Sequence, residues 1–258
     1  MAVCESETFN ETRGTLARSV DGCPWRVTMV MPAFNEGEVI RHVVTRSRAA
    51  LRELTGDFEI IVVDDGSSDD TGRILDELVD EQVRVIHFAK HRGYGCALQA
   101  GIEVAVHPLV VFMDSDDQFD PLDLRHLLPL SAEADVIVGY RAVRRDGALR
   151  RLASRLYNFA VSQVLGLVFR DVNCAFKLFR RDVLFGLRLS SEGYAISAEM
   201  LARTQRAGYR LREVPVSHHP RRTGRSKVRL SDIPRALAHI LALRRVLPNQ
   251  KPDLRVSL

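Results

Sequence analysis

The sequence predicts an α/β fold built on one central, mostly parallel sheet, and three observations support this prediction. Short runs that are almost continuous in Val, Ile, Leu and Phe recur along the first half of the chain, as expected of parallel strands buried on both faces. Longer amphipathic stretches between these runs are typical of surface helices. With 258 residues and 46% hydrophobic content, the chain can bury a full core.

The expected elements alternate regularly in the first half and less regularly in the second. Five strands, with helices between them, are expected over residues 26–32, 58–64, 83–88, 109–114 and 134–140. The second half predicts a helix at 148–166, a strand at 174–179, a helix at 195–207, a strand at 211–218 and a final amphipathic helix. The domain prediction is a flexible extension over 1–24, a main domain over 25–228, and a helix and tail over 229–258.

Cysteine usage and hydropathy exclude several classes of protein. The cysteines, Cys4, Cys23, Cys96 and Cys174, lack the spacing of a zinc site or of a disulfide framework. The polar N-terminus has no apolar signal-peptide core, and no apolar run approaches the roughly 20 residues of a spanning helix. We therefore expect a cytoplasmic protein that is either soluble or bound at the cytoplasmic face of the membrane.

Charge is unevenly distributed along the chain, although the net charge is only +4. Acidic residues crowd 64–70 and 114–123, whereas arginines crowd 141–155 and 221–229. This pairing predicts a bound metal ion together with a phosphorylated ligand. Nucleic acid is not the expected ligand, because the basic segments lack interleaved aromatic residues for stacking.

Polar motifs stand at the ends of four expected strands, where open α/β sheets bind their ligands. The motifs are PAFNEGE, DDGSSDDTG, KHRGYG and DSDDQ. In the last motif, Asp114, Asp116 and Gln118 could present three oxygen ligands from one turn, a donor set that suits Mg²⁺ or Mn²⁺. The alternative is that Asp114 caps the following turn and the other acids are solvated. We favour the metal site, because the motif ends an apolar strand.

The second and third motifs indicate a nucleotide pocket. Asp65 could bind ribose hydroxyls or base nitrogens, and 66–69 predicts a tight turn with a helix N-cap. Gly93 and Gly95 permit a close approach of the backbone to a ligand. Leu98 stands where a dinucleotide fingerprint needs its third glycine, which argues against a Rossmann dehydrogenase.

A series of motifs carries a resemblance to a known family. In order, they are PAFNE, VVDDGSSDDT, HRGYGCALQAG, MDSDDQFDP, VGYR, DVNCAFKLFRR and HPRRTGRSK. Over residues 26–228 they resemble the family 2 inverting glycosyltransferases of the GT-A fold, and are most similar to the dolichol-phosphate mannose synthase and polyprenyl-phosphate glycosyltransferase branch. The resemblance implies that 25–228 is a GT-A domain. It would transfer one sugar from a nucleotide-diphosphate sugar, of GDP-mannose or UDP-glucose type, to a polyprenyl or dolichyl phosphate.

The resemblance also implies roles for individual residues. The nucleotide-sugar pocket would be lined by Pro32, Ala33, Asn35, Glu36, Asp65, Gly93, Asp114 and Ser115. The metal would be held by Asp114, Asp116 and Gln118. Catalytic roles would fall to Asp116, Arg141, Arg150 and Arg221, with Arg141 approaching the diphosphate. The acceptor phosphate would contact Arg150, Ser154, Arg221, Ser226 and Lys227.

The chain departs from the family pattern at several points. Phe34 stands where tyrosine is common, and Ala175 stands where the branch usually has glycine, which leaves the donor identity open. The only tryptophan, Trp25, cannot form the QxxRW motif of the polymerising members, so single-sugar transfer is expected. The chain also lacks the C-terminal membrane segments of many relatives, which favours peripheral attachment or a membrane-anchored partner.

Two acceptor classes stay open, a lipid phosphate and a hydroxyl group. A phosphate monoester is largely dianionic at neutral pH and can attack the anomeric carbon without a general base. A hydroxyl acceptor, on a small metabolite or a saccharide, would need such a base. Glu199 is the best candidate for it, and Glu192 is less well placed.

The final amphipathic helix has two expected roles, binding the membrane or packing on the main domain. Its N-cap is predicted near Ser231 or Asp232, with Pro234 in the first turn. The helical period places Ile233, Leu237, Ile240 and Leu241 on one face.

Overall fold

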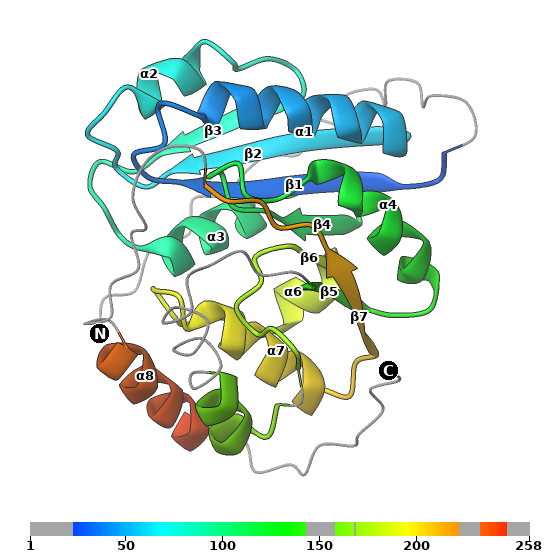
Figure 1. Ribbon diagram of the computed structural model, residues 1–258, viewed down its shortest axis with the longest axis vertical. Coiled ribbons are helices and arrows are strands. Elements are labelled where there is room, and N and C mark those ends of the chain that lie inside the picture. Colours follow the sequence, from blue (N-terminus) through cyan, green and yellow to red (C-terminus); the bar gives the residue numbers. More distant parts are fainter. Residues whose placement is uncertain (1–22, 143–157, 168, 222–232, 247–258) are drawn as a thin grey trace, which may run out of the picture.

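The computed structural model describes residues 23–142, 158–167, 169–221 and 233–246. These residues confirm the predicted α/β fold, with a seven-stranded sheet in the order β3-β2-β1-β4-β6-β5-β7 (Figure 1). The strands are β1 (Arg26–Ala33), β2 (Asp57–Asp64), β3 (Val83–His87), β4 (Leu109–Phe112), β5 (Val136–Arg141), β6 (Lys177–Arg180) and β7 (Leu211–Val216). The α-helices are α1 (Ile40–Leu54), α2 (Thr71–Asp76), α3 (Tyr94–Glu103), α4 (Leu124–Leu127), α6 (Arg181–Gly186), α7 (Ile196–Arg206) and α8 (Ile233–Val246). Two short 3₁₀ helices, η1 (Pro121–Asp123) and η2 (Leu128–Ala132), flank α4.

Within the described sheet, every strand pair is parallel except the two that involve β6. β1 pairs in parallel with β2 and β4, β2 with β3, and β5 with β7. β6 runs antiparallel between β4 and β5. In the register of the first three strands, Ala33 lies beside Asp64, and Asp64 lies beside His87. The carboxyl ends of these strands therefore meet at one edge of the sheet, as the strand-end motifs predicted.

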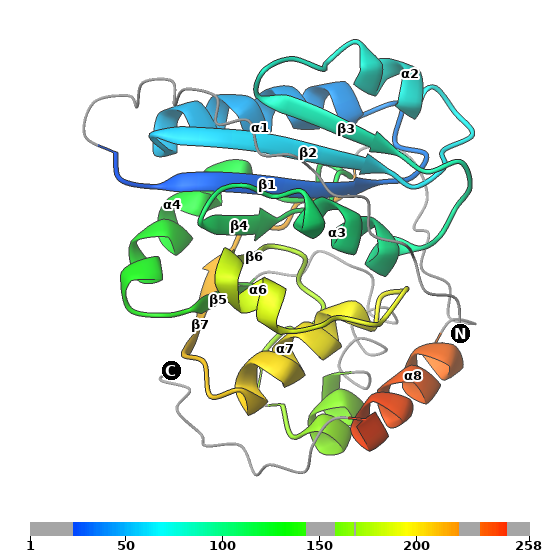
Figure 2. The ribbon, with the colours of Figure 1, turned by 180° about the vertical axis from the view of Figure 1, so that it is seen from behind.

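Alternate residues of the central strands contribute to two hydrophobic cores. In β1, Met29 and Met31 belong to the core formed with α1 and α2, whereas Val30 belongs to the core formed with α3 and α7. Figures 1 and 2 show these helices on opposite faces of the sheet. The almost continuous apolar runs in the sequence follow from this burial on both faces.

The helix α8 packs on the domain, which is one of the two roles expected for it. Ile240 and Leu243 are buried in the same core as α7. Leu241 is 52% exposed, so the prediction that Ile240 and Leu241 share one face is wrong. The predicted cap at Ser231 or Asp232 lies outside the described residues. No described helix has both the length and the apolar character needed to cross a bilayer.

Several predicted elements have other bounds in the structure or are only partly described. The strand predicted at 109–114 ends at Phe112, because the chain turns at the DSDDQ motif, where Asp117 has a φ of 59°. The strand predicted at 174–179 begins only at Lys177, because Cys174 is part of a turn in which its N–H donates to the carbonyl of Asp171. Of the helix predicted at 148–166, residues 158–165 are described and helical.

Candidate active site

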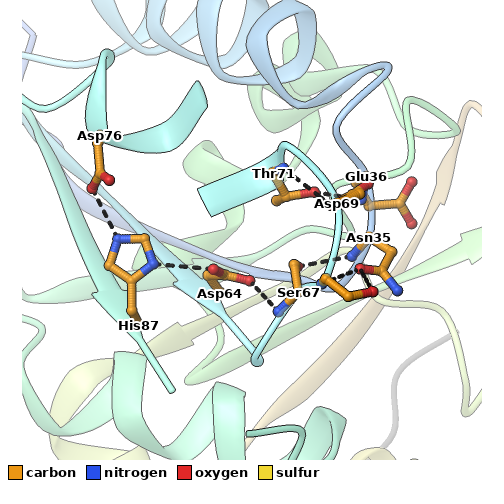
Figure 3. Close-up of polar contacts among 9 residues, drawn as sticks. Asn35, Glu36, Asp64, Ser67, Asp69, Thr71, Asp76 and His87 are labelled. Atoms are coloured by element: carbon orange, nitrogen blue, oxygen red, sulfur yellow. Dashed lines mark hydrogen bonds and ion pairs between the residues drawn. The ribbon is translucent and has the colours of Figure 1, made fainter. Parts of the chain in front are cut away.

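The loops after β1 and β2 are joined to one another by hydrogen bonds (Figure 3). The backbone N–H of Asn35 donates to Ser67 Oγ at 2.9 Å, and Asn35 Oδ1 accepts from the N–H of Ser68 at 2.7 Å. The N–H of Glu36 donates to Thr71 Oγ1 at 2.8 Å. Asn35 has a φ of 52°, a conformation that asparagine tolerates better than most residues. These contacts place the predicted pocket residues Asn35 and Glu36 beside the second motif.

The helix cap predicted in the second motif is provided by Asp69. Its Oδ1 accepts from the N–H of Thr71 at 3.0 Å, and its Oδ2 accepts from the N–H of Gly37 at 3.1 Å. Asp70 directly precedes α2, but its side chain makes no capping hydrogen bond. The carboxylate of Asp69 therefore secures both the start of α2 and the loop after β1.

His87, at the end of β3, lies between two carboxylates (Figure 3). Its Nδ1 is 3.0 Å from Asp64 Oδ2, and its Nε2 is 3.0 Å from Asp76 Oδ1. Asp64 also accepts from the N–H of Ser67 at 3.0 Å. Partial burial lowers the pKa of His87, but the hydrogen bonds to Asp64 and Asp76 outweigh it, so the pKa is raised overall. The imidazole thus holds Asp64, which in turn binds the start of the loop after β2.

Asp65, predicted to bind the nucleoside, is 3% exposed and holds the loop after β3. Its Oδ1 accepts from the N–H of Arg92 at 2.7 Å, and its Oδ2 accepts from the N–H of Gly93 at 2.9 Å. The imidazole Nδ1 of His91 lies 2.9 Å from the same Oδ2. The ring of His91 in turn stacks on Phe34 at 4.2 Å between centroids. A nucleoside contact by Asp65 or Gly93 stays a prediction.

The glycines of the HRGYG motif allow a close approach, and in the structure they are approached by protein backbone. The N–H of Gly95 donates to the carbonyl of Glu192 at 2.6 Å. A Cβ atom at position 95 would lie 2.1 Å from the carbonyl oxygen of Ser191, and one at position 93 would lie 2.8 Å from that of Glu192. Gly93 and Gly95 therefore let the 191–192 segment seat on the start of α3.

Asp114, Ser115 and Asp116 follow β4 and lie against the end of β1. Ser115 Oγ donates to the carbonyl of Pro32 at 2.7 Å, and the N–H of Asp65 donates to the carbonyl of Ala33 at 2.8 Å. Burial and the nearby negative charge of Asp116 raise the pKa of Asp114 to about 7. The turn is capped by Asp116, whose Oδ1 accepts from the N–H of Gln118 at 3.2 Å, and not by Asp114.

The four aspartates of the DSDDQFDP stretch divide into two pairs. Asp114 and Asp116 lie at the carboxyl edge of the sheet, whereas Asp117 and Asp120 bind Arg46 of α1 at 2.9 and 3.2 Å. Asp117 is buried and adopts the left-handed conformation, which turns its carboxylate toward α1. Arg46 thus fixes the turn on the side that faces α1. Of the four aspartates, Asp117 and Asp120 therefore have a structural role, and Asp114 and Asp116 are the candidates for the chemistry.

Arg221, which follows β7, contacts this turn. Its Nη2 donates to Asp116 Oδ2 at 2.5 Å. Two hydrogen bonds to the backbone of His219 keep the segment in place: its N–H donates to the carbonyl of Gln118 at 2.8 Å, and its carbonyl accepts from the side-chain Nε2 of Gln118 at 3.1 Å. Burial lowers the pKa of Arg221, but the carboxylate of Asp116 outweighs it and the net pKa is raised.

The half-buried Arg141 and the buried Lys177 add further positive charge to this side of the site. Arg141 makes a bidentate pair with Asp171, with Nε to Oδ2 at 2.6 Å and Nη2 to Oδ1 at 2.9 Å. Lys177 is 1% exposed and its ammonium donates to the carbonyl of Cys174. Burial lowers the pKa of Lys177, against the opposing charges of Asp171 and Asp114. Asp171 therefore orients Arg141 before any ligand binds.

The carboxylates Asp114 and Asp116 fit a divalent cation. Two hard oxygen donors stand on one turn: Asp114, whose pKa is raised by burial and by the charge of Asp116, and Asp116 itself, which is paired with Arg221. Among the described residues, no three His, Cys, Asp or Glu side chains converge into a complete metal site. A site with two carboxylates is the kind that substrate phosphates complete around Mg²⁺ or Mn²⁺.

Glu199 does not suit the role of a general base that the hydroxyl-acceptor hypothesis gave it. It is 0% exposed, and its carboxylate accepts from the N–H groups of Ser190 and Ser191 and from Arg203 at 2.8 Å. Burial raises the pKa of Glu199, but the hydrogen bonds from Ser191 and Ser190 outweigh it and lower the pKa overall, which makes the carboxylate a weaker base. The residue anchors a loop.

Sequence reasoning missed three residues near the carboxylates, and it predicted four that are not described. Tyr94 donates its hydroxyl to Asp114 Oδ1 at 3.0 Å. Lys177 and Asp171 could have been found as charged residues next to or within the apolar stretch VNCAFKLF, where a charge needs a partner. The predicted phosphate contacts that lie outside the described residues are Arg150, Ser154, Ser226 and Lys227.

Comparison with known proteins identifies relatives of this arrangement. The chain is 32% identical over 208 residues to the undecaprenyl-phosphate 4-deoxy-4-formamido-L-arabinose transferase of Pseudomonas fluorescens, with 78% of this chain and 59% of that protein covered. It is 30% identical over 223 residues to the dodecaprenyl-phosphate galacturonate synthase of Rhizobium johnstonii, with 84% and 66% covered. The chain thus spans less than two thirds of the length of either relative.

The fold also matches a solved structure, and a family profile matches most of the described sheet. The structure is glucosyl-3-phosphoglycerate synthase of Mycobacterium tuberculosis with Mn²⁺, UDP and glucosyl-3-phosphoglycerate, at a TM-score of 0.66 and 24% identity, covering 88% of this chain and 82% of that one. Residues 28–185 match the profile described as Glycosyl transferase family 2. The extent of this match and the identity with the curated relatives show that the chain belongs to glycosyl transferase family 2.

Proposed function

We propose that the chain transfers a single sugar, with inversion, from a nucleotide-diphosphate sugar to a polyprenyl phosphate, with Mg²⁺ or Mn²⁺ as cofactor. The observation that carries the proposal is the pair Asp114 and Asp116 at the carboxyl edge of the sheet, with Arg221 on Asp116. This arrangement offers oxygen ligands to a cation and a guanidinium to a diphosphate. The acceptor class is supported by the names of the two curated relatives, which specify undecaprenyl and dodecaprenyl phosphate.

In this proposal the protein's own residues position two anions and balance their charge. Asp114 and Asp116 would hold the cation, which stabilises the departing diphosphate when it is bound. Arg221 would exchange its bond to Asp116 for phosphate oxygens, and Arg141, already oriented by Asp171, would add positive charge beside it. No side chain needs to remove a proton, because a phosphate monoester is largely dianionic at neutral pH.

The hydroxyl-acceptor hypothesis is the weaker alternative. It needs Glu199 as the general base, but that carboxylate is buried and accepts hydrogen bonds from the 190–191 backbone and from Arg203. The exposed Glu192 has its backbone carbonyl on the start of α3, but its side chain has no described contact with the carboxylates of the site. The phosphate acceptor is therefore preferred, because it needs no base.

The donor and the cofactor are tested together by one experiment. The purified protein is incubated with UDP-glucose, UDP-galacturonate and GDP-mannose, each with and without polyprenyl phosphate, and release of nucleoside diphosphate is measured. The proposal expects release that depends on polyprenyl phosphate, stops in EDTA and returns with Mn²⁺ or Mg²⁺. Release of nucleoside diphosphate that is the same with and without polyprenyl phosphate would overturn it.

The proposed acceptor also implies work at the cytoplasmic face of a membrane, either by peripheral attachment or through a membrane-anchored partner. On α8, Leu241 is 52% exposed, and the neighbouring Arg244 and Arg245 are exposed too, a combination that suits anionic headgroups. Flotation with anionic vesicles should therefore carry the wild-type protein and carry less of Leu241→Glu. Equal flotation of both would remove α8 from this role.

A further inference from the structure

The hydroxyl of Tyr94 holds one of the two candidate metal ligands. Tyr94 is the first residue of α3, and its hydroxyl donates to Asp114 Oδ1 at 3.0 Å. A tyrosine side chain is neutral at pH 7, so it contributes a hydrogen bond without neutralising the carboxylate. The bond fixes the rotation of the carboxylate and engages only one of its oxygens.

A second tyrosine holds the ring of Tyr94. Tyr194, in the loop before α7, stacks on it with 5.2 Å between centroids and 24° between planes. Stacked aromatic rings stabilise one another beyond the surface that they bury. Tyr194 is 44% exposed, so the stacked pair extends from the carboxylate of Asp114 to the solvent.

The loop that carries Tyr194 is itself secured at two points. Its carbonyls accept from α3: that of Glu192 from the N–H of Gly95, and that of Ser191 from Gln99 Nε2 at 3.1 Å. Its N–H groups at 190 and 191 donate to the buried carboxylate of Glu199. A continuous set of contacts therefore runs from Glu199 through the loop to the start of α3 and Asp114.

We propose that Tyr94 is a positioning residue for the metal-binding carboxylate Asp114, and that Tyr194 sets the orientation of its ring. The inference rests on the proposed function, because it assumes that Asp114 binds the cofactor. Carboxylates that bind metals are generally hydrogen-bonded by outer groups, and loss of such a group weakens metal affinity by about 10- to 100-fold. The hydroxyl of Tyr94 has this relation to Asp114.

The test is the affinity for Mn²⁺ in the presence of UDP or GDP, measured from the electron paramagnetic resonance signal of free Mn²⁺. Tyr94→Phe keeps the stacked ring and removes only the hydroxyl, so Mn²⁺ affinity should fall by about 10- to 100-fold. The turnover number at saturating Mn²⁺ should stay within a few-fold of wild type. Tyr140→Phe is the matched control, because that hydroxyl accepts from Arg170 at 2.9 Å, and it should bind Mn²⁺ like wild type.

Further variants and the wild type separate the ways in which the inference could fail. Tyr194→Ala should weaken Mn²⁺ binding less than Tyr94→Phe, and an unchanged affinity would remove Tyr194 from the proposal. If wild type binds Mn²⁺ and Tyr94→Phe binds it equally well, the positioning role is overturned while the proposed function stands. If wild-type protein neither binds nor needs a divalent cation, the metal-dependent function itself fails.

Discussion

Asp65 and Asp116 follow strands of the same sheet and are almost equally buried, at 3% and 7% exposed, yet they have different partners. Asp65 accepts from the backbone N–H groups of Arg92 and Gly93, which lie on the neighbouring loop. Asp116 binds the guanidinium of Arg221, 105 residues further along the chain. The carboxylate of Asp65 thus fixes the conformation of a loop, whereas that of Asp116 forms an ion pair with a distant segment of the chain.

The same difference separates the two sides of the site. On the side of β1 to β3, side-chain oxygens of Ser67, Thr71 and Asp69 accept from backbone N–H groups, which shapes the loops in advance. On the side of β4 to β7, charged groups are paired, as in Arg141 with Asp171 and Arg221 with Asp116. A ligand that carries both a cation and phosphates can replace such pairs without leaving a buried charge alone. This comparison leads to four predictions.

The largest effect is expected from removal of a carboxylate on the charged side. Asp116→Ala should lower the rate of sugar transfer by about 10²- to 10³-fold, because the departing diphosphate would lose its cation site. EDTA should abolish transfer by wild-type protein and add little to the variant. Asp70→Asn is the control, because that exposed acid binds only Arg73, and it should keep wild-type activity. Full activity of Asp116→Ala in a folded protein would contradict the site.

Removal of the paired guanidinium should have the next largest effect. Arg221→Ala should reduce transfer to polyprenyl phosphate by about 10²-fold, and Arg221→Lys should restore little, because lysine lacks the planar fork. Titration with nucleoside diphosphate should show weakened binding. Arg210→Ala removes an exposed arginine that binds Asp135, and it is the matched control. Turnover close to wild type in Arg221→Ala would place that residue outside the reaction.

A smaller effect on rate, but a clear one on stability, is expected at Glu199. Glu199→Gln turns an amide toward N–H donors and leaves Arg203 without its carboxylate, so the free energy of unfolding should fall by about 1–3 kcal/mol. The rate of the folded fraction should fall less than 10-fold, below the roughly 10²- to 10⁴-fold that loss of a general base costs. Urea unfolding and single-turnover assays measure the two effects, with Glu192→Gln as the control. A large loss of transfer rate in Glu199→Gln, with an unchanged free energy of unfolding, would favour the hydroxyl-acceptor hypothesis.

The smallest effect is a pH dependence on the loop-shaping side, at His87. Because the folded-state pKa of His87 is raised above its ordinary value of 6.5, its contribution to stability is complete below that value. The contribution is lost as the pH rises through the raised pKa. Wild-type protein should therefore lose stability relative to His87→Gln as the pH rises above 6.5, by less than about 1 kcal/mol since the imidazole is 40% exposed. Parallel pH profiles of the two proteins would contradict this.

The sequence alone predicted the sheet and the edge at which its motifs meet. Both follow from short-range patterns: apolar runs mark strands buried on two faces, and parallel strands bring their carboxyl ends together. The same reasoning predicted Asp114 and Asp116 as metal ligands, because they follow an apolar strand at the edge where α/β sheets bind ligands, and this role stays a prediction. It also predicted phosphate contacts by Arg150, Ser154, Ser226 and Lys227, and these stay predictions.

Only the tertiary structure decided which polar groups are partners. Three pairs show this: Tyr94 with Asp114, Arg221 with Asp116, and the 190–191 backbone with Glu199. The packing of separate segments of the chain brings the two members of each pair together. Sequence periodicity reports which face of an element is buried, but it carries no information on which side chain from a distant segment meets it there. For this reason Glu199 could be predicted as a base from its sequence and yet be an anchor in the fold. The chemistry of each residue was determined by the sequence, and its role was determined by the neighbours that folding gave it.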